Sequence, residues 1–236
     1  MTYIQAPADK RLVWYLAMEE YLAKQVEEEL FITWIVSPTV IFGRHQVMEA
    51  EVNVDFCRAN GIAMYRRKSG GGCVYADEGN LMMSMISPNK HSEVVFQQFL
   101  DKISDVLRHW GLPAVKSEHN DIMVEGMKVS GNACYALSTG TIVHGTMLVD
   151  VDLDMLQQAI TPSKEKLAKH GVKSVRQRVA NLAILVTNPQ LRTSTLVANR
   201  LSDALCLYQR ELTEQEIATI DRIEQSYLDP QFIVGK

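Results

Sequence analysis

The chain has 236 residues, of which 47% are hydrophobic and 22% charged, and its formal net charge is -4. This length suits one sizeable domain, and the acidic balance argues against a nucleic-acid partner, which usually needs a basic surplus. No apolar run approaches the roughly 18 to 20 residues that cross a bilayer, and the first residues carry no export signal. We therefore expect no membrane contact and a cytoplasmic location.

Helices and short strands alternate along the chain without internal repeats. Apolar residues at helical spacing predict a first helix from Asp9 to about Val26. The other expected elements, in chain order, are strands at 30–36 and 39–42, a short helix capped by Asn53, strands at 62–66 and 81–86, a helix at 92–110, strands at 122–124, 128–137 and 141–149, and helices at 153–160, 164–170, 179–186, 194–208 and 214–227. Strands that arrive in neighbouring runs predict an α+β fold, with a mainly antiparallel or mixed sheet packed with helices.

The segment RRKSGGGCVYADEGN, residues 66–80, places three basic residues directly before a serine and three glycines. It lacks the Lys-Ser/Thr of a P-loop, so a Walker site is rejected. Glycines between two strands let the backbone pass close to a flat or charged ligand. Side chains alternate along an extended chain, so Arg67 is expected to face away from Arg66 and Lys68. The alternative is a tight loop with solvated arginines.

The segment EHNDIMVEGMKVSGNA, residues 118–133, contains a second candidate site. Asn120 and Asp121 offer hard oxygen ligands, suited to Mg²⁺ or to a ribose hydroxyl. Lys128 begins the returning strand of a tight hairpin, which sets a lysine and a carboxylate on neighbouring strands. Ser130 and Gly131 then add small residues near the same space. The alternative is an ordinary hairpin with an exposed lysine.

Two further segments carry polar chemistry. His144 lies in an apolar strand before Gly145 and Thr146, where a lone histidine is more often a hydrogen-bonded core residue than a catalyst. Between Ser163 and Val179, six Lys or Arg residues accompany a single Glu, which indicates either an anionic partner or a solvated basic surface.

In their order and spacing, these motifs resemble the catalytic domain of lipoate-protein ligase A and its relatives over about residues 12–185, including PTVIFGRHQ at 38–46 and AEVN at 50–53. The resemblance implies a fold shared with biotin ligases and with class II aminoacyl-tRNA synthetase cores. It implies a ligase that attaches lipoate, as lipoyl-AMP formed from ATP with Mg²⁺, to one lysine of an acceptor. The implied acceptors are lipoyl domains of 2-oxoacid dehydrogenase complexes or the glycine-cleavage H protein. Octanoate would suit the same slot.

The resemblance also assigns roles to residues. Lys128 matches the lysine that holds the acyl carbonyl and phosphate oxygens, where a fixed cation favours the transition state of amine attack. Asp121 matches the position associated with metal and nucleotide, and Val40, Val74, Tyr75 and Val143 are expected near the acyl chain. The basic segment, including Lys164 and Arg178, is expected to enclose the adenylate or to meet an acidic lipoyl domain. Besides Lys128 and Asp121, the predicted site comprises Arg67, Ser69, Gly70, Gly71, Gly72, Val74, Tyr75, Asn80, Ser130, Gly131, His144, Gly145 and Thr146.

Two departures from the family pattern bear on these roles. Ala76 stands where many such ligases carry a histidine. The chain ends at YLDPQFIVGK, so we expect residues 1–236 to form a single catalytic domain without the usual C-terminal accessory domain. Either a separate partner chain supplies that domain, or the protein transfers a preformed acyl-adenylate, or it takes acyl groups from another carrier.

The last alternative is testable by cysteine chemistry. The four cysteines, Cys57, Cys73, Cys134 and Cys206, form no CxxC and are expected to be free thiols. A thioester route requires an activated thiolate near the lysine, and the segment VKSEHNDI upstream of Lys128 contains no cysteine. We therefore expect Cys73 and Cys134 to be small apolar fillers. A non-catalytic module that binds lipoyl-AMP or a lipoyl domain is the remaining alternative, with Lys128 as its discriminator.

Overall fold

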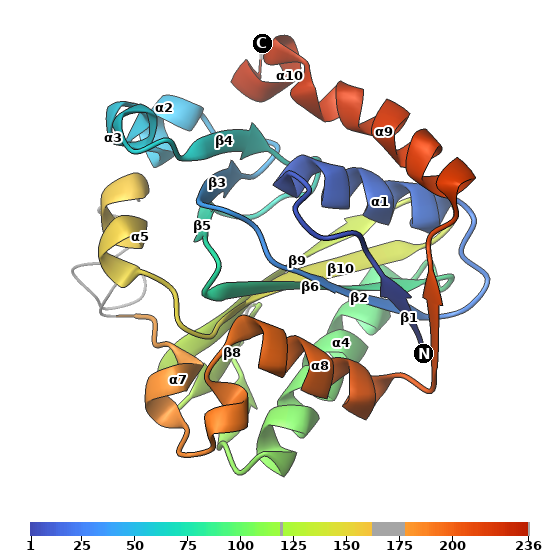
Figure 1. The fold of residues 1–236 in the computed structure, drawn as a ribbon, viewed down its shortest axis with the longest axis vertical. Helices are drawn as coiled ribbons and strands as arrows, with labels where there is room; N and C mark the ends of the chain where they lie inside the picture. Colours follow the sequence, from blue (N-terminus) through green and yellow to red (C-terminus); the bar gives the residue numbers. More distant parts are fainter. Residues whose placement is uncertain (119, 162–177, 236) are drawn as a thin grey trace.

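The computed structural model describes residues 1–118, 120–161 and 178–235. Its centre is an eight-stranded sheet in the order β11-β1-β2-β6-β10-β9-β8-β7 (Figure 1). These strands are β1 (Thr2–Gln5), β2 (Leu30–Trp34), β6 (Asn80–Ser87), β7 (Ala114–Lys116), β8 (Asp121–Val124), β9 (Met127–Ala136), β10 (Thr141–Leu148) and β11 (Tyr208–Glu211). Within this sheet, all neighbouring pairs in the stretch β2-β6-β10-β9-β8-β7 are antiparallel, whereas β1 is parallel to both of its neighbours. The expected mixed and mainly antiparallel sheet is therefore confirmed.

A three-stranded sheet in the order β4-β3-β5 stands beside the large one. Its strands are β3 (Thr39–Phe42), β4 (Ala63–Arg66) and β5 (Val74–Ala76), and residues 67–73 connect β4 to β5. The glycine-rich loop therefore connects two strands, as the sequence predicted, although the strand that follows it, β5, was not expected. Helices α2 (Met48–Glu51), α3 (Val54–Ala59) and α5 (Leu153–Ala159) lie at this side of the molecule (Figure 1).

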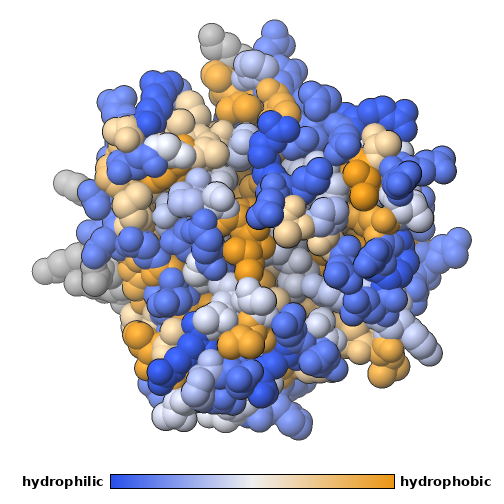
Figure 2. All heavy atoms as spheres, in the orientation of Figure 1, coloured by the Kyte–Doolittle hydropathy of each residue, from blue (hydrophilic) through white to orange (hydrophobic). Residues whose placement is uncertain are grey.

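Longer helices cover both faces of the large sheet (Figure 1). On one face α1 (Leu12–Lys24) contacts β6 and β10 and packs against α9 (Glu214–Leu228), which leads to α10 (Pro230–Val234). On the other face lie α4 (Ser92–His109) and α8 (Ser194–Leu205). The surface in the same orientation is largely hydrophilic, and apolar side chains reach it in separate patches (Figure 2). No helix among the described residues is long and apolar enough to cross a membrane.

Three expectations about the elements need correction or qualification. The helix predicted to reach residue 208 ends at Leu205, because Tyr208 pairs with Thr2 in a parallel edge strand that no local pattern reveals. The helix expected at 179–186 is a single turn, α7 (Leu182–Leu185). The helix expected at 164–170 lies outside the described residues. By contrast, Asn53 does cap α3, since its side chain accepts from the amide of Phe56 at 3.2 Å.

Candidate active site

A cavity of about 280 Å³ lies where the large sheet meets the glycine-rich loop. Its described lining combines backbone glycines, apolar side chains and four charged side chains. The lining residues are Leu16, Trp34, Ile41, Arg67, Gly71, Gly72, Cys73, Val74, Met82, Asn120, Asp121, Lys128, Gly131, Asn132, Ala133, His144, Gly145, Thr146 and Arg178. The three motifs that the sequence singled out therefore meet at one cavity.

One row of cross-strand neighbours crosses the sheet beneath this cavity. Trp34 of β2 pairs with Met82 of β6, which pairs with Thr146 of β10. Thr146 pairs with Gly131 of β9, which pairs with Asp121 of β8. Four strand spacings of about 4.8 Å separate the two ends of the row by roughly 19 Å. The row therefore runs from large apolar side chains to a buried carboxylate.

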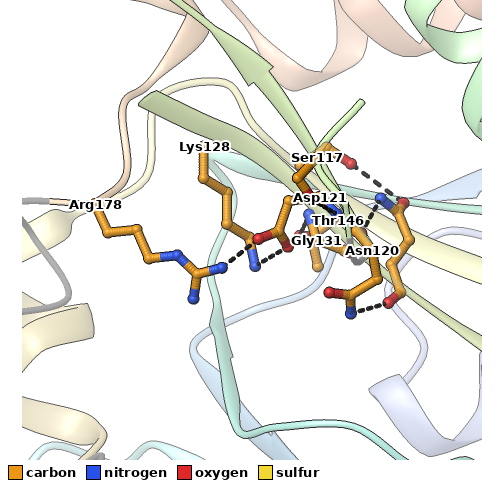
Figure 3. Close-up of polar contacts among 9 residues, drawn as sticks. Ser117, Asn120, Asp121, Lys128, Gly131, Thr146 and Arg178 are labelled. Atoms are coloured by element: carbon orange, nitrogen blue, oxygen red, sulfur yellow. Dashed lines mark hydrogen bonds and ion pairs between the residues drawn. The ribbon is translucent and has the colours of Figure 1, made fainter. Parts of the chain in front are cut away.

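Asp121 is the centre of a charged cluster at one end of the row (Figure 3). Its Oδ1 lies 2.7 Å from Lys128 Nζ, and its Oδ2 accepts a hydrogen bond from the guanidinium of Arg178. The Asp121 side chain is only 3% exposed, while the two basic side chains keep about a fifth of their surface accessible. A buried carboxylate needs such partners, and the paired cations are held where they face the cavity.

A break in strand pairing aims Lys128 into the cavity. Ile122 pairs with Ser130 and Met123 with Lys128, so the β8–β9 ladder skips Val129. In an unbroken strand, residues 128 and 131 would face opposite sides of the sheet. The extra residue reverses the alternation, as β-bulges do, and brings Lys128 to the face that Gly131 occupies.

Gly131 leaves the space that the lysine occupies. A Cβ at this position would lie 2.4 Å from Lys128 Nζ and 2.7 Å from its Cε. Gly145 has a similar function for a neighbouring residue, since a Cβ there would lie 1.9 Å from Asn132 Oδ1. The Asn132 side-chain amide in turn donates to the carbonyl of Asn120 at 2.9 Å, which holds the residue that directly precedes β8.

Arg67 stabilises the glycine-rich loop from within. Its Nη2 donates to the carbonyls of Gly70 at 2.7 Å and Gly72 at 2.6 Å, and its Nη1 to that of Ile41 at 3.3 Å. The residue is 6% exposed, and this burial lowers its pKa to about 10, so it remains charged at neutral pH. Gly71 adopts φ +91°, and a Cβ there would lie 2.9 Å from Arg67 Nη2. Arginine and glycines thus form one compact structure.

Ser69 and His144 belong to a buried hydrogen-bonded chain beside the cavity. Ser69 Oγ lies 2.8 Å from His144 Nε2, and His144 Nδ1 lies 3.0 Å from Glu19 Oε2. Ser84 Oγ donates to the other carboxylate oxygen of Glu19. This chain joins α1, β6 and β10 to the loop. Glu19 was not predicted from the sequence, although the adjacent acids Glu19 and Glu20 in a mostly apolar helix could have indicated it.

At the apolar end of the cavity, Val74 was predicted from the sequence, whereas Leu16, Trp34, Ile41 and Met82 were not. Leu16, Trp34, Ile41 and Met82 all belong to one buried cluster. The ring of Tyr15 stacks on Trp34 with centroids 5.3 Å apart, which fixes the indole. Ile41 and Val74 are direct cross-strand partners that both reach the cavity.

Some predicted site residues lie elsewhere because strand residues alternate between faces. Val40 and Tyr75 form the neighbouring cross-strand pair and pack into a different apolar cluster. Val143 belongs to the core on the opposite side of the sheet. Asn80 and Ser130 are buried outside the cavity lining, and the Asn80 amide donates to the Tyr75 carbonyl. Gly70 is exposed and lies outside the cavity lining, although Gly71 and Gly72, which follow it, belong to that lining.

A metal role for Asp121 competes with its two cations. Within the described residues no three His, Cys, Asp or Glu side chains gather as a metal site. Mg²⁺ in nucleotide sites is commonly held by one or two carboxylates together with phosphate oxygens. Coordination through Asp121 would require Lys128 or Arg178 to move away from its oxygen. In this structure the carboxylate is their counter-ion, and metal binding stays a prediction.

Comparisons with known proteins agree with this geometry. Residues 13–205 match the model of the lipoyl protein ligase A/B catalytic domain. Lipoate-protein ligase LplJ of Bacillus subtilis (strain 168) is 34% identical over 219 residues, covering 89% of this chain and 66% of that protein. Lipoate-protein ligase 1 of Staphylococcus aureus (strain Mu50 / ATCC 700699) is 40% identical over 177 residues, covering 74% of this chain and 54% of that protein. The chain thus spans about half to two thirds of the length of these relatives.

A solved structure extends the likeness to the whole chain. It is described as a bi-partite lipoate protein ligase and its E2 lipoyl domain from Thermoplasma acidophilum, with 26% identity and a TM-score of 0.84. The match covers 99% of this chain and 96% of that one. The chain therefore belongs to the lipoyl protein ligase A/B catalytic domain family.

Proposed function

We propose that this protein binds lipoate as its adenylate and transfers the lipoyl group to a lysine of a lipoyl domain. The observation that carries the proposal is the cross-strand row from Trp34 to Asp121, which joins an apolar slot to a paired cationic centre. A fatty-acid-like tail with an anionic, activated head has the same polarity along its length. The names of the relatives support lipoate as the acyl group.

Substrate binding would place the tail among Leu16, Trp34, Ile41 and Met82 and the head near Lys128. Burial of methylene groups favours the bound state by about 0.8 kcal/mol for each CH₂. The backbone of Gly71 and Gly72, which lines the cavity, permits close approach of the adenylate. Arg67 holds that backbone in place and adds a buried positive charge.

Transfer would proceed by attack of the acceptor amine on the acyl carbonyl. A C–N bond forms, the C–O bond to phosphate breaks, AMP leaves with the electron pair, and the amine loses a proton to solvent. Negative charge grows on the carbonyl oxygen and on the departing phosphate. Lys128 Nζ, fixed by Asp121, can stabilise that charge without reorganisation, and fixed charges of this kind contribute most when water is excluded. Arg178 would stabilise the phosphate from the other side of the carboxylate.

The family suggests the remaining components, which we include as part of the proposal. ATP with Mg²⁺ would supply the adenylate, and Asp121, the carboxylate in the described lining, would hold that metal once Lys128 or Arg178 moves away from its oxygen. Residues 1–236 would form a single catalytic domain, with a separate chain completing activation, as the bi-partite relative suggests. Lipoyl domains of 2-oxoacid dehydrogenases are the favoured acceptors, and the glycine-cleavage H protein is the alternative. The proposed location of the reaction is the cytoplasm.

A two-tube assay tests the proposal. One tube contains the protein, ATP, Mg²⁺, lipoate and an apo lipoyl domain, and the other contains synthetic lipoyl-AMP in place of ATP and lipoate. Mass spectrometry of the acceptor lysine is the readout. Modification in both tubes indicates a complete ligase, and modification in the second alone indicates a transferase that needs a partner for activation. Absence of modification in both, with lipoyl-AMP still bound by Lys128→Ala, would replace the enzyme with a binding module.

A further inference from the structure

Three consecutive basic residues at the start of the glycine-rich loop have different partners. Arg67 turns toward the cavity, as described above. Arg66 and Lys68 turn the other way, as strand alternation predicts, and both reach the C-terminal helices. In Figure 1 these helices, α9 and α10, lie beside β4, and contacts between the elements agree.

Arg66 joins α10 to the segment that follows β3. Its Nε donates to the carbonyl of Ile233 at 3.0 Å and its Nη2 to that of Val234 at 3.2 Å. Its Nη1 donates to the carbonyls of Arg44 at 2.8 Å and Gln46 at 2.7 Å. The residue is 3% exposed, so these carbonyls take the place of the water molecules that would solvate an exposed guanidinium. A positively charged guanidinium beside the last carbonyls of a helix also interacts favourably with the partial negative charge at that end.

The segment held by Arg66 touches the glycine-rich loop directly. The amide of Arg44 donates to the carbonyl of Ser69 at 2.9 Å. The backbone of Gly43 lies so close to Gly71 that a Cβ on Gly43 would be 2.2 Å from the Gly71 oxygen. A continuous set of contacts therefore runs from α10 through Arg66 to both ends of the Ser69–Gly71 stretch.

Lys68 makes the second connection. Its Nζ lies 2.7 Å from Glu20 Oε2 and 3.3 Å from Ser226 Oγ of α9. The same ammonium lies 4.3 Å from the ring centroid of Tyr227, within cation–π range. Burial by itself would raise the pKa of Glu20, but hydrogen bonds from Lys24 and Lys68 lower it below its ordinary value, so the carboxylate is charged at neutral pH.

We propose that Arg66 and Lys68 are positioning residues that tie the glycine-rich loop to α10 and α9, and so set how firmly the loop closes over the adenylate. The adenylate named in this inference rests on the proposed function. The mechanical part, which is the attachment of the loop to the two helices, does not depend on it. The ligand-facing Arg67 lies between these two attachments in sequence. Movement at either attachment would shift the guanidinium and the glycine backbone relative to Lys128.

Amide hydrogen exchange of residues 67–73 in the ligand-free, full-length chain tests the mechanical part. Arg66→Gln should speed exchange in this loop at least tenfold, while the exposed Arg58→Gln on α3, which removes the same charge, should leave it unchanged. Lys68→Gln should speed exchange severalfold, and Lys24→Gln should not, although both lysines pair with Glu20. Unchanged loop exchange in both Arg66→Gln and Lys68→Gln would overturn the inference.

A double-mutant comparison separates the α10 connection from general destabilisation. Gly235 has φ +77°, and a Cβ there would lie 2.6 Å from Arg66 Nη2. Gly235→Ala should speed loop exchange by about threefold, and Arg66→Gln/Gly235→Ala should match Arg66→Gln, because the clash disappears with the guanidinium. Gly111→Ala, with φ +86° and nothing within 4 Å, is the matched control. Additive effects of the two changes would contradict a shared connection.

Kinetics connect the loop to the substrate. In the lipoyl-AMP assay, Arg66→Gln should raise KM about tenfold and change kcat by less than threefold, with partial rescue by Arg66→Lys. A loss confined to kcat would overturn the positioning role. If the wild type modifies no acceptor but the exchange results hold, the proposed function fails and the connection stands. If the wild type is active and loop exchange is unchanged, the connection fails alone.

Discussion

The two ends of the cavity differ in how their structure is maintained. At the charged end, Asp121 holds Lys128 and Arg178 through ion pairs between β8, β9 and residue 178. At the apolar end, Trp34 and Met82 are held by packing within a large buried cluster. Ion pairing fixes the direction of a charge, whereas packing fixes the shape of a volume. We therefore expect changes at the charged end to alter kcat and changes at the apolar end to alter KM for the acyl substrate.

Loss of the Lys128 ammonium should have the largest effect. If Lys128 stabilises the developing charge as we propose, Lys128→Ala should lower kcat in the lipoyl-AMP assay by about 100- to 1,000-fold or more, a range typical for loss of a transition-state donor. KM should change little. Lys116→Ala, which removes an exposed lysine on neighbouring β7, should retain full activity. A variant at position 128 with near-normal kcat would place the chemistry elsewhere.

A methyl group at position 131 should have the next largest effect. Gly131→Ala places a Cβ 2.4 Å from Lys128 Nζ, so the lysine must leave its position. Because small misplacements of catalytic groups are costly, we expect kcat to fall about 10- to 100-fold. Gly70→Ala is the control, since nothing lies within 4 Å of its Cβ. Equal losses in both variants would mean that the glycines matter for reasons other than the space each leaves.

These two residues also illustrate what could be predicted from the sequence. The motif order placed the glycine-rich loop, Asp121, Lys128 and His144 near one another, and the structure brings all of them to one cavity. The β8–β9 bulge could not be predicted, because alternation alone puts Lys128 on the same face as Ser130. Residue type indicated which chemistry to expect, but pairing between strands decides which neighbour faces the cavity.

The apolar end was harder to predict for the same reason. Val40 and Ile41 are equally apolar in sequence, and only the pairing of β3 with β5 shows that Ile41 faces the cavity. Edge strand β11 depends on Tyr208 meeting Thr2, more than 200 residues away in the chain. Elements with strong local patterns, such as α4 and the β9–β10 hairpin, were predicted to within a few residues. Long-range pairing supplies the rest.

A polar substitution at the apolar end should have a smaller and different effect. Met82→Gln keeps nearly the same length but places an amide in the slot without a ready partner, so KM for lipoyl-AMP should rise about tenfold, equivalent to about 1.4 kcal/mol. The kcat value should stay within about threefold of wild type. Met83→Gln provides the control, because Met83 packs into the core on the opposite face. It should lower thermal stability without raising KM, and a drop in kcat for Met82→Gln would remove the distinction between the ends.

The smallest effect is expected for Cys134, which lies outside both ends. Burial raises the pKa of its thiol to about 11, so at pH 8 only about one molecule in a thousand carries the thiolate that a thioester route needs. Cys134→Ala should change transfer by less than about threefold. The thiol in the folded protein should react slowly with iodoacetamide at pH 8 and faster at pH 10, whereas protein unfolded in urea should react rapidly at both. A large loss of transfer together with an acyl-enzyme adduct on this residue would favour a thioester route, and Lys128 would then act on a bound acyl group and not on an adenylate.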